Sequence, residues 1–332
     1  MRGPVIVVGQ NSVLQKTCTI GRLVRGEVNR IESQYVSASG KGMNVASVLS
    51  ALDVPAVLYG YAGGENGRRF IAGCEERDIE TNITRIQSET RQCMTIIEPD
   101  GTTTEIVEPS PGVTERESRA FLESVLSAIP QAALVCICGT AVREEPEDTY
   151  GSIVREARAA GVPVILDAHR VHGLRALDES PDILKINESE LAAVYTALHA
   201  ESSPSPAATR QDRELMARTI MDKYGVHTIV VTRGRHGAEA YATHGWATAA
   251  SSITEIENPI GCGDAFTAAI AHRMTQDGES GDTSPPLAGI LRHGVTIATA
   301  HGLSMQPGDL QLSHISRVAP TILVSGSEGG GG

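Results

Sequence analysis

The chain has 332 residues, enough for one large α/β domain or for two domains of average size. Apolar residues make up 41% of it and aromatic residues only 3%, so the core must be built mainly from Ala, Val, Ile and Leu, as in a parallel sheet covered by helices. The 28 basic and 40 acidic residues give a net charge of −12, which argues against a surface for nucleic acid or for an anionic membrane. The chain opens on a short apolar strand, and no stretch has the length of a membrane span, so we expect a soluble, cytoplasmic protein.

Buried strands and two β-rich segments alternate in the first third of the chain. Residues 4–9 and 54–62 are continuous apolar runs, which are typical of buried strands. Residues 11–38 contain short alternating pieces broken by glycine, and residues 90–110 have the pattern of a hairpin around Pro99-Asp100-Gly101. We expect the two segments to join in a small sheet that covers the site.

From residue 112 onward, helix and strand patterns alternate. Strands are expected at residues 133–138, 163–167, 183–186 and 228–232. Repeated βα units predict a parallel sheet that binds its ligands at the carboxyl ends of the strands. The polar candidates at those ends are Gly139, Asp167, Asn187, Thr232 and Arg233.

Two glycine-rich turns each lead into a helix. The first, residues 39–44, can present backbone N–H groups, the Lys41 ammonium group and the Asn44 amide to a polar ligand. In the second, residues 258–266, glycines leave N–H groups open for a phosphate, and Asp264 could accept the proton of an attacking hydroxyl. On this stretch alone, an N-cap role for Asp264 after a tight turn explains the pattern equally well.

Taken together, these motifs resemble the signatures of the ribokinase-like (PfkB) carbohydrate kinases. Residues 39–46 with 60–67 resemble the first signature, and Asn258 to Phe266 resemble the second, with its Gly-x-Gly-Asp turn. Residues 185–191 look like the family's Asn-x-x-Glu element, and residues 231–238 like its nucleotide-edge strand and loop. The resemblance runs from about residue 4 to 320.

The resemblance implies a three-layer α/β/α fold of the ribokinase-like type, with a mostly parallel central sheet and a small β-sheet lid. Separately from the resemblance, the predicted lid suggests a homodimer formed through it, because a small sheet with exposed edges often needs a partner. We expect residues 1–10, 39–88 and 111–322 to form the nucleotide-binding core, residues 11–38 and 89–110 the lid, and residues 323–332 a flexible tail.

The implied activity is an ATP-dependent transfer of the γ-phosphoryl group to a hydroxyl of a sugar or sugar phosphate. Asp264 would be the general base, and Gly261, Cys262 and Gly263 the anion hole. Asn187 and Glu190 would organise Mg²⁺ through water, although a helix cap with a first-turn acid explains the same spacing. The family also suggests a monovalent cation such as K⁺. The implied cofactor-binding residues are Lys185, Asn187, Thr232, Arg233, Gly234 and Asn258.

On the substrate side the resemblance is to the branch that phosphorylates sugar phosphates, such as 1-phosphofructokinase and tagatose-6-phosphate kinase. Arg30, Lys41 and Arg91 would bind the phosphate that the substrate already carries. The full set of implied substrate-binding residues is Gln15, Arg30, Gly40, Lys41, Asn44 and Arg91, with Asn44 on a sugar hydroxyl.

Three departures from the family pattern lie on the substrate side. Gln15 stands where the family usually has an Asp, residues 140–143 replace a Ser-Leu-Pro-Pro-Gly stretch, and Ser39 replaces a Gly. A nucleoside or other small-alcohol kinase of the same fold is therefore an alternative, although the three cations count against it. A non-catalytic sugar- or nucleotide-binding member is a second alternative, against which the retention of Asp264 argues.

Overall fold

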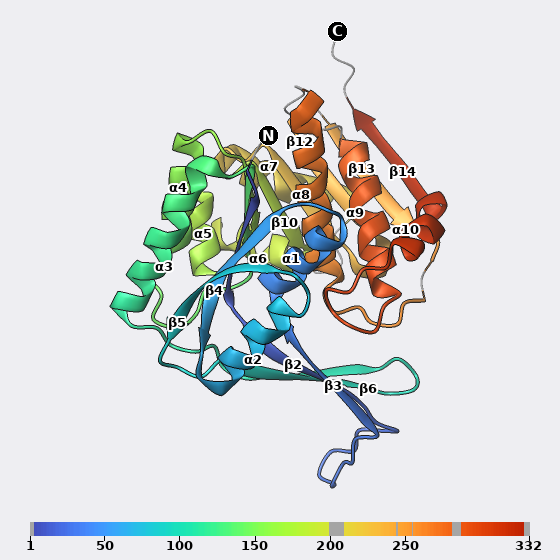
Figure 1. Cartoon of the computed structure of the whole chain (residues 1–332). Helices are drawn as coiled ribbons and strands as arrows, with labels where there is room; N and C mark the ends of the chain where they lie inside the picture. The colour runs from blue at the N-terminus through green and yellow to red at the C-terminus, as the bar shows by residue number, and fades with distance from the viewer. Residues whose placement is uncertain (1–2, 199–208, 244, 254, 281–286, 329–332) are drawn as a thin grey trace.

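The computed structural model describes residues 3–198, 209–243, 245–253, 255–280 and 287–328. Within these ranges the strands form two sheets, one of ten strands and one of four. Helices cover both faces of the larger sheet, and the smaller sheet lies beside α2 (Gly64–Glu75) at one end of the molecule (Figure 1). The predicted three-layer α/β/α arrangement with a small second sheet is confirmed.

The central sheet is parallel from β5 to β11. The hairpins β11-β12 and β12-β13, together with β14, which pairs with β13, add an antiparallel edge. Its order from one edge to the other is β14-β13-β12-β11-β10-β9-β8-β1-β4-β5. The bounds are β1 Val5–Asn11, β4 Ala56–Gly63, β5 Glu80–Ile86, β8 Leu134–Cys138, β9 Val164–Asp167, β10 Ile183–Asn187, β11 Thr228–Thr232, β12 Ala238–Ala242, β13 Gly245–Ser251 and β14 Ile322–Glu328.

Two apolar clusters hold the three layers together. Along β1, Val5 and Val7 belong to the cluster on one face of the sheet, and Ile6 and Val8 to the cluster on the other. A strand buried on both faces needs apolar side chains at every position, which is why the sequence shows a continuous run there. The first face carries α1 Lys41–Ala51, α2 Gly64–Glu75, α8 Cys262–Ser280, α9 Leu287–Gly302 and α10 Leu312–Val318; the second carries α3 Glu115–Ala128, α4 Thr149–Ala159, α5 Val171–Leu177, α6 Glu188–Leu198 and α7 Arg210–Tyr224.

The small sheet is built from the two segments that the sequence assigned to a lid. Its strands are β2 Val13–Thr19, β3 Ser33–Ser39, β6 Arg91–Ile97 and β7 Thr103–Val107, in the order β3-β2-β6-β7. The hairpin predicted around Pro99-Asp100-Gly101 is present, and Gly101 has the positive φ of +83° that its turn requires. That this sheet moves to close over a ligand stays a prediction.

The prediction of a flexible tail from residue 323 is wrong for residues 323–328. These residues form β14, which pairs with β13 from Gly245↔Glu328 to Ser251↔Ile322. The segment is rich in Ser and Gly, so composition suggested a loose end, but ladder hydrogen bonds come from the backbone and need no apolar side chains. Residues 329–332 lie outside the described ranges.

Across the described ranges, no helix combines the length and the apolar character needed to cross a bilayer.

Candidate active site

Two neighbouring cavities lie at the carboxyl ends of the parallel strands. The smaller cavity, of about 190 Å³, is lined by residues that include Lys41, Arg91, Asp167, His169, Arg170 and Glu190. The larger cavity, of about 540 Å³, is lined by residues that include Asn187, Thr232, Gly234, Arg235, Cys262 and Gly263. The turn from β10 into α6 contributes Asn187 to the larger cavity and Glu190 to the smaller one, so the two cavities share a wall.

Asp264 lies in the first turn of α8, between residues that line the two cavities, although it lines neither of them itself. Its neighbour Gly263 lines the larger cavity, and its carboxylate interacts electrostatically with Lys41, which lines the smaller one. Asp264 is only 7% exposed and accepts a hydrogen bond of 2.8 Å from the Asn44 amide. Burial raises the pKa of this carboxyl to about 6, although Lys41 and Lys185 oppose the shift. A carboxylate with this pKa can take up a proton near neutral pH.

The glycine turn before α8 is shaped by two of the predicted site residues. Gly261 has φ +85°, and a side chain there would begin 3.0 Å from the His301 ring, so only glycine fits. Asn258 is fully buried; it accepts a hydrogen bond from the Ile260 N–H and donates one to the Met305 carbonyl. Asn258 therefore holds the turn in place, and it does not line the larger cavity that it was predicted to serve.

The predicted anion-hole amides differ in their availability. The Cys262 N–H already donates to the Pro259 carbonyl over 3.3 Å. Gly263 and Asp264 lie in the first turn of α8, where amide N–H groups have no acceptor within the helix. Of the three predicted amides, only that of Cys262 has a backbone acceptor within the described ranges, and the Asp264 N–H is a further open donor at this helix start.

Asp167, at the end of β9, is the central group of a buried charge cluster. Its carboxylate lies 3.0 Å from the Lys41 ammonium group and 2.9 Å from that of Lys185, and it accepts a hydrogen bond of 2.8 Å from the Thr267 hydroxyl. Burial alone would raise the pKa of Asp167, but the two lysines reverse the shift and hold it below its usual value. Asp167 in turn raises the pKa of Lys41. The ionised carboxylate fixes both ammonium groups beside Asp264.

Asn187 and Glu190 have the hydrogen bonds of a helix cap. The Asn187 side chain accepts from the Glu190 N–H over 2.9 Å, and the Glu190 carboxylate accepts from the Asn187 N–H over 2.9 Å. The other Glu190 oxygen lies 3.3 Å from the His169 ring. In the described part of the chain, no three His, Cys, Asp or Glu side chains are grouped so that they could hold a metal ion. A helix cap thus explains the spacing of the two residues, and their role beside a nucleotide-bound Mg²⁺ ion stays a prediction.

The other predicted nucleotide-side residues divide into two groups. Thr232 and Gly234 line the larger cavity. Arg233 does not line it, because its guanidinium group lies 3.1 Å from Glu188 and 3.0 Å from Glu239. Lys185 is buried against Asp167.

The predicted substrate residues divide in the same way. Lys41 and Arg91 line the smaller cavity, where the Arg91 Nε atom is buried without a hydrogen-bond partner. Gly40 is the N-cap residue just before α1; it has φ +112°, and a side chain there would collide with the Asn11 carbonyl. Asn44 is committed to Asp264 rather than open to a sugar hydroxyl.

Two predicted substrate residues lie away from the smaller cavity. Gln15 is buried in the small sheet, where its amide donates to the Thr95 hydroxyl over 2.8 Å. Arg30 is exposed in the connection between β2 and β3. Neither residue lines either cavity.

Sequence reasoning named Asp167 only as a polar candidate at a strand end, without a role, and missed three further charged or titratable residues of the cavities: His169, Arg170 and Arg235. Asp167 had a usable signal, because it is the last residue of a strand in a parallel sheet. The other three lie in loops or short turns, where no periodicity predicts the direction of a side chain.

Comparison with known proteins gives one family and several solved structures of the same fold. Residues 6–301 match the model of the pfkB family carbohydrate kinases. Phosphofructokinase-2 from Escherichia coli, solved in complex with substrates and products, has a TM-score of 0.85 at 18% identity, over 96% of this chain and 98% of that one. A possible 1-phosphofructokinase from Thermotoga maritima has a TM-score of 0.83 at 23% identity, over 97% and 99%. Ribokinase from Arabidopsis thaliana, solved with ribose and ATP, has a TM-score of 0.73 at 21% identity, over 96% and 98%.

The fold resemblance expected from the sequence is thereby confirmed. Since the family model spans nearly the whole chain, the protein belongs to the pfkB family of carbohydrate kinases, phosphotransferases that act on an alcohol group.

Proposed function

We propose that the protein transfers the γ-phosphoryl group of ATP to a hydroxyl of a sugar phosphate, with Asp264 as the general base. The observation that carries this proposal is the setting of Asp264: a buried carboxylate with a pKa of about 6, at the start of a helix, whose neighbour Gly263 lines the larger cavity and whose electrostatic partner Lys41 lines the smaller one. The larger cavity would hold the nucleotide and the smaller one the acceptor. Asp264 would then lie close to both ligands, because its neighbour Gly263 lines the larger cavity and Lys41, with which its carboxylate interacts, lines the smaller one.

In the proposed reaction, Asp264 takes the proton of the acceptor hydroxyl. At the same time the hydroxyl oxygen of the acceptor forms a bond to the γ-phosphorus, and the bond from that phosphorus to the β–γ bridging oxygen breaks. The amides of Gly263 and Asp264 would donate to the phosphoryl oxygens as charge develops on them, and the positive end of the α8 dipole would add to this effect. Lys41 and Lys185, both held by Asp167, would contribute fixed positive charge close by.

Mg²⁺ bound to the nucleotide phosphates would neutralise part of their charge, with Glu190 and Asn187 as its protein neighbours. We also propose a monovalent cation as an activator. A potassium complex of Escherichia coli phosphofructokinase-2 supports this part of the proposal.

The charges of the smaller cavity support a substrate that already carries a phosphate. Lys41, Arg91 and Arg170 line it, although the whole chain carries a net charge of −12. Asp167 is shared between Lys41 and Lys185, and Glu190 also lines the cavity, so it is the two arginines that leave the lining net positive for an anionic group. Escherichia coli phosphofructokinase-2 has been solved with fructose-6-phosphate and Arabidopsis ribokinase with ribose, so solved proteins of this fold carry both classes of sugar.

We propose a homodimer formed through the small sheet and the connection between β2 and β3. Several large apolar side chains are exposed there, as expected of a surface that a second copy covers. These are Val24, Val28, Ile31, Tyr35, Ile106 and Val107. Light scattering on the purified chain would test this, and a monomer at micromolar concentration would contradict it.

The function is tested with a panel of sugars, sugar phosphates, nucleosides and small alcohols, with ATP, Mg²⁺ and K⁺, read out as ADP release. We expect turnover on sugar phosphates in the wild type and a loss of several orders of magnitude in kcat for Asp264→Asn, with ATP binding retained. Asp222→Asn, on the exposed face of α7, is the matched control. Turnover of unphosphorylated acceptors alone would overturn the acceptor class. ATP binding without turnover of any acceptor would instead favour a non-catalytic family member.

A further inference from the structure

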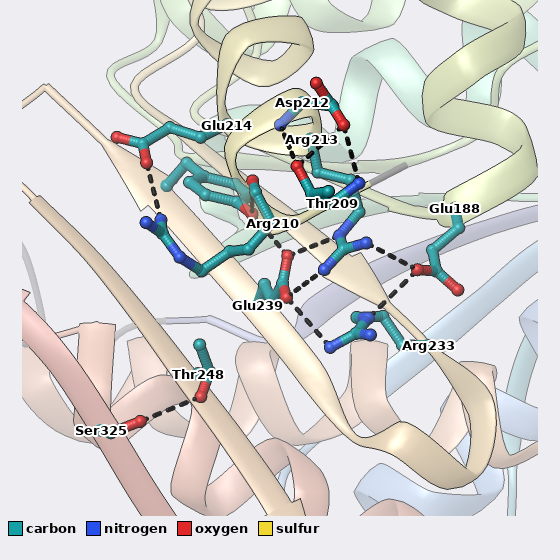
Figure 2. Close-up of polar contacts among 11 residues, drawn as sticks. Glu188, Thr209, Arg210, Asp212, Arg213, Glu214, Arg233, Glu239, Thr248 and Ser325 are labelled. Atoms are coloured by element: carbon teal, nitrogen blue, oxygen red, sulfur yellow. Dashed lines mark hydrogen bonds and ion pairs between the residues drawn. The ribbon is translucent and has the colours of Figure 1, made fainter. Parts of the chain in front are cut away.

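Two arginines and two glutamates form a network of ion pairs (Figure 2): Arg213, Arg233, Glu188 and Glu239. Glu239 on β12 is 1% exposed, and its carboxylate accepts two hydrogen bonds from Arg213 on α7, of 2.7 and 2.6 Å. The Tyr241 hydroxyl donates to the same carboxylate. A buried carboxylate with this many donors stays ionised and holds its partners in one geometry.

Arg233 also belongs to this network, where two carboxylates of the protein pair with its positive charge. Figure 2 shows the Arg233 guanidinium group between Glu188 and Glu239, at 3.1 and 3.0 Å. Arg213 also reaches Glu188, at 3.2 Å, so two arginines face two glutamates. These four charges cancel, and Arg233 does not line the larger cavity. The network thus adds no net charge to a nucleotide site.

The network anchors a tight turn that presents a different arginine to the larger cavity. The Arg233 N–H donates to the Gly237 carbonyl over 2.8 Å, and the His236 N–H donates to the Arg233 carbonyl over 3.0 Å. Gly237 has φ +81°, and a side chain there would collide with the Ala249 carbonyl. The backbone of the turn is therefore packed directly against the backbone of β13 at this position. Within this turn, Gly234, Arg235 and Gly237 line the larger cavity.

Arg235 differs from Arg233 in each of these respects. Its side chain is exposed, and within the described ranges it makes no ion pair. Among the described residues that line the larger cavity it alone carries a charge. A nucleoside triphosphate brings several negative charges to a chain that is already strongly acidic. A cation that makes no ion pair within the protein is the group that can pair with these charges.

We propose that Arg235 binds the phosphate chain of the nucleotide, and that Arg233, Glu239 and Arg213 act as positioning residues that fix its turn. This inference rests on the proposed function, since it takes the larger cavity as the nucleotide site. It reverses the roles that the sequence suggests, in which Arg233 lines the phosphates.

The test measures binding of ATP, ADP and AMP by calorimetry, without an acceptor, at several salt concentrations. Arg235→Ala should weaken ATP binding about tenfold, which corresponds to about 1.4 kcal/mol, should weaken AMP binding less, and should reduce the salt dependence of the ATP Kd. Arg235→Lys should restore part of the affinity. Arg116→Ala, an exposed site on α3 with the same change in net charge, should leave all three affinities unchanged.

Arg233→Met gives the complementary result if the inference is right. It should lower the melting temperature and weaken the binding of all three nucleotides by a similar factor, because the turn loosens. The salt dependence of the ATP Kd should stay as in the wild type. Glu188→Gln, a milder change in the same network, should act in the same direction with a smaller effect.

The outcomes separate this inference from the proposed function. If the wild type binds ATP and Arg235→Ala binds it equally well, the role of Arg235 is overturned and the kinase proposal stands. If Arg233→Met, and not Arg235→Ala, loses the salt dependence, the two roles are reversed. If the wild type binds no nucleotide, both proposals fall.

Discussion

Replacing Asp264 by Asn should make the protein more stable at neutral pH while it abolishes turnover. Asn has nearly the same shape, and its carbonyl oxygen can still accept the hydrogen bond from Asn44. What it removes is a negative charge in a site that is only 7% exposed. A buried charge that function requires is a cost to the folded state, so removing it should stabilise the fold.

The magnitude follows from the pKa of Asp264, which burial raises from 3.8 to about 6. Between these two pH values the folded state keeps a proton that the unfolded state has released. The stability of the wild type therefore falls as the pH rises through this window, and the full loss is present above about pH 6. A difference of about 2 pKa units corresponds to roughly 3 kcal/mol.

Urea unfolding of the wild type and of Asp264→Asn between pH 4.5 and 8 would measure this difference. The stability advantage of the variant should grow from pH 4.5 to about pH 6 and then remain constant. Asp222→Asn, which removes an exposed carboxylate on α7, should change stability little at any of these pH values. If Asp264→Asn were no more stable than the wild type at pH 7, or if its advantage did not depend on pH, the desolvation argument would be refuted.

The same carboxylate should control the pH profile of turnover: kcat/KM should rise about tenfold per pH unit below about pH 6 and level off above it, because only ionised Asp264 accepts a proton. Asn44→Leu removes a hydrogen bond that lowers this pKa, so the acidic limb should move to higher pH; a limb that stays in place would contradict the assigned contact. Lys41→Met should lower kcat/KM for the acceptor by about 10²-fold with little change in the Kd of ATP, and a selective loss of ATP affinity would show that Lys41 serves the nucleotide instead. Deleting residues 322–332 removes β14 and uncovers the edge of β13, so the free energy of unfolding should fall by roughly 2 kcal/mol and light scattering should detect aggregation; an unchanged melting curve would argue against a structural role for this strand.

Much of the fold could be predicted from the sequence because its signals are local. Buried parallel strands are continuous apolar runs, and the residue types of Pro99-Asp100-Gly101 are by themselves enough to predict a turn. β14 was missed for the opposite reason, since its pairing uses backbone groups and its Ser- and Gly-rich composition is that of a loose end. β5 had no prediction either, because Glu80–Ile86 is an edge strand with several polar, partly exposed side chains.

The candidate site could be predicted only in part, and Asp264 and Asn44 show where the limit lies. Each follows a glycine turn that marks the start of a helix, so the sequence indicated two polar helix starts at the site. It could not indicate that they meet, since they are 220 residues apart and only the sheet order places α1 against α8. Once they meet, the Asn44 amide is occupied by the Asp264 carboxylate and no longer serves a ligand.

By itself, the sequence determined the class of the protein: a parallel α/β sheet, glycine turns that can hold phosphate, and an acidic residue at a helix start. Only the tertiary structure decided which charged groups are available. Lys185 and Arg233 look alike in sequence as basic residues near strand ends, and both are held by buried carboxylates, whereas Arg235 and Arg170 line cavities. Residue type is local information, but the charge that a ligand meets depends on what the rest of the fold has placed beside it.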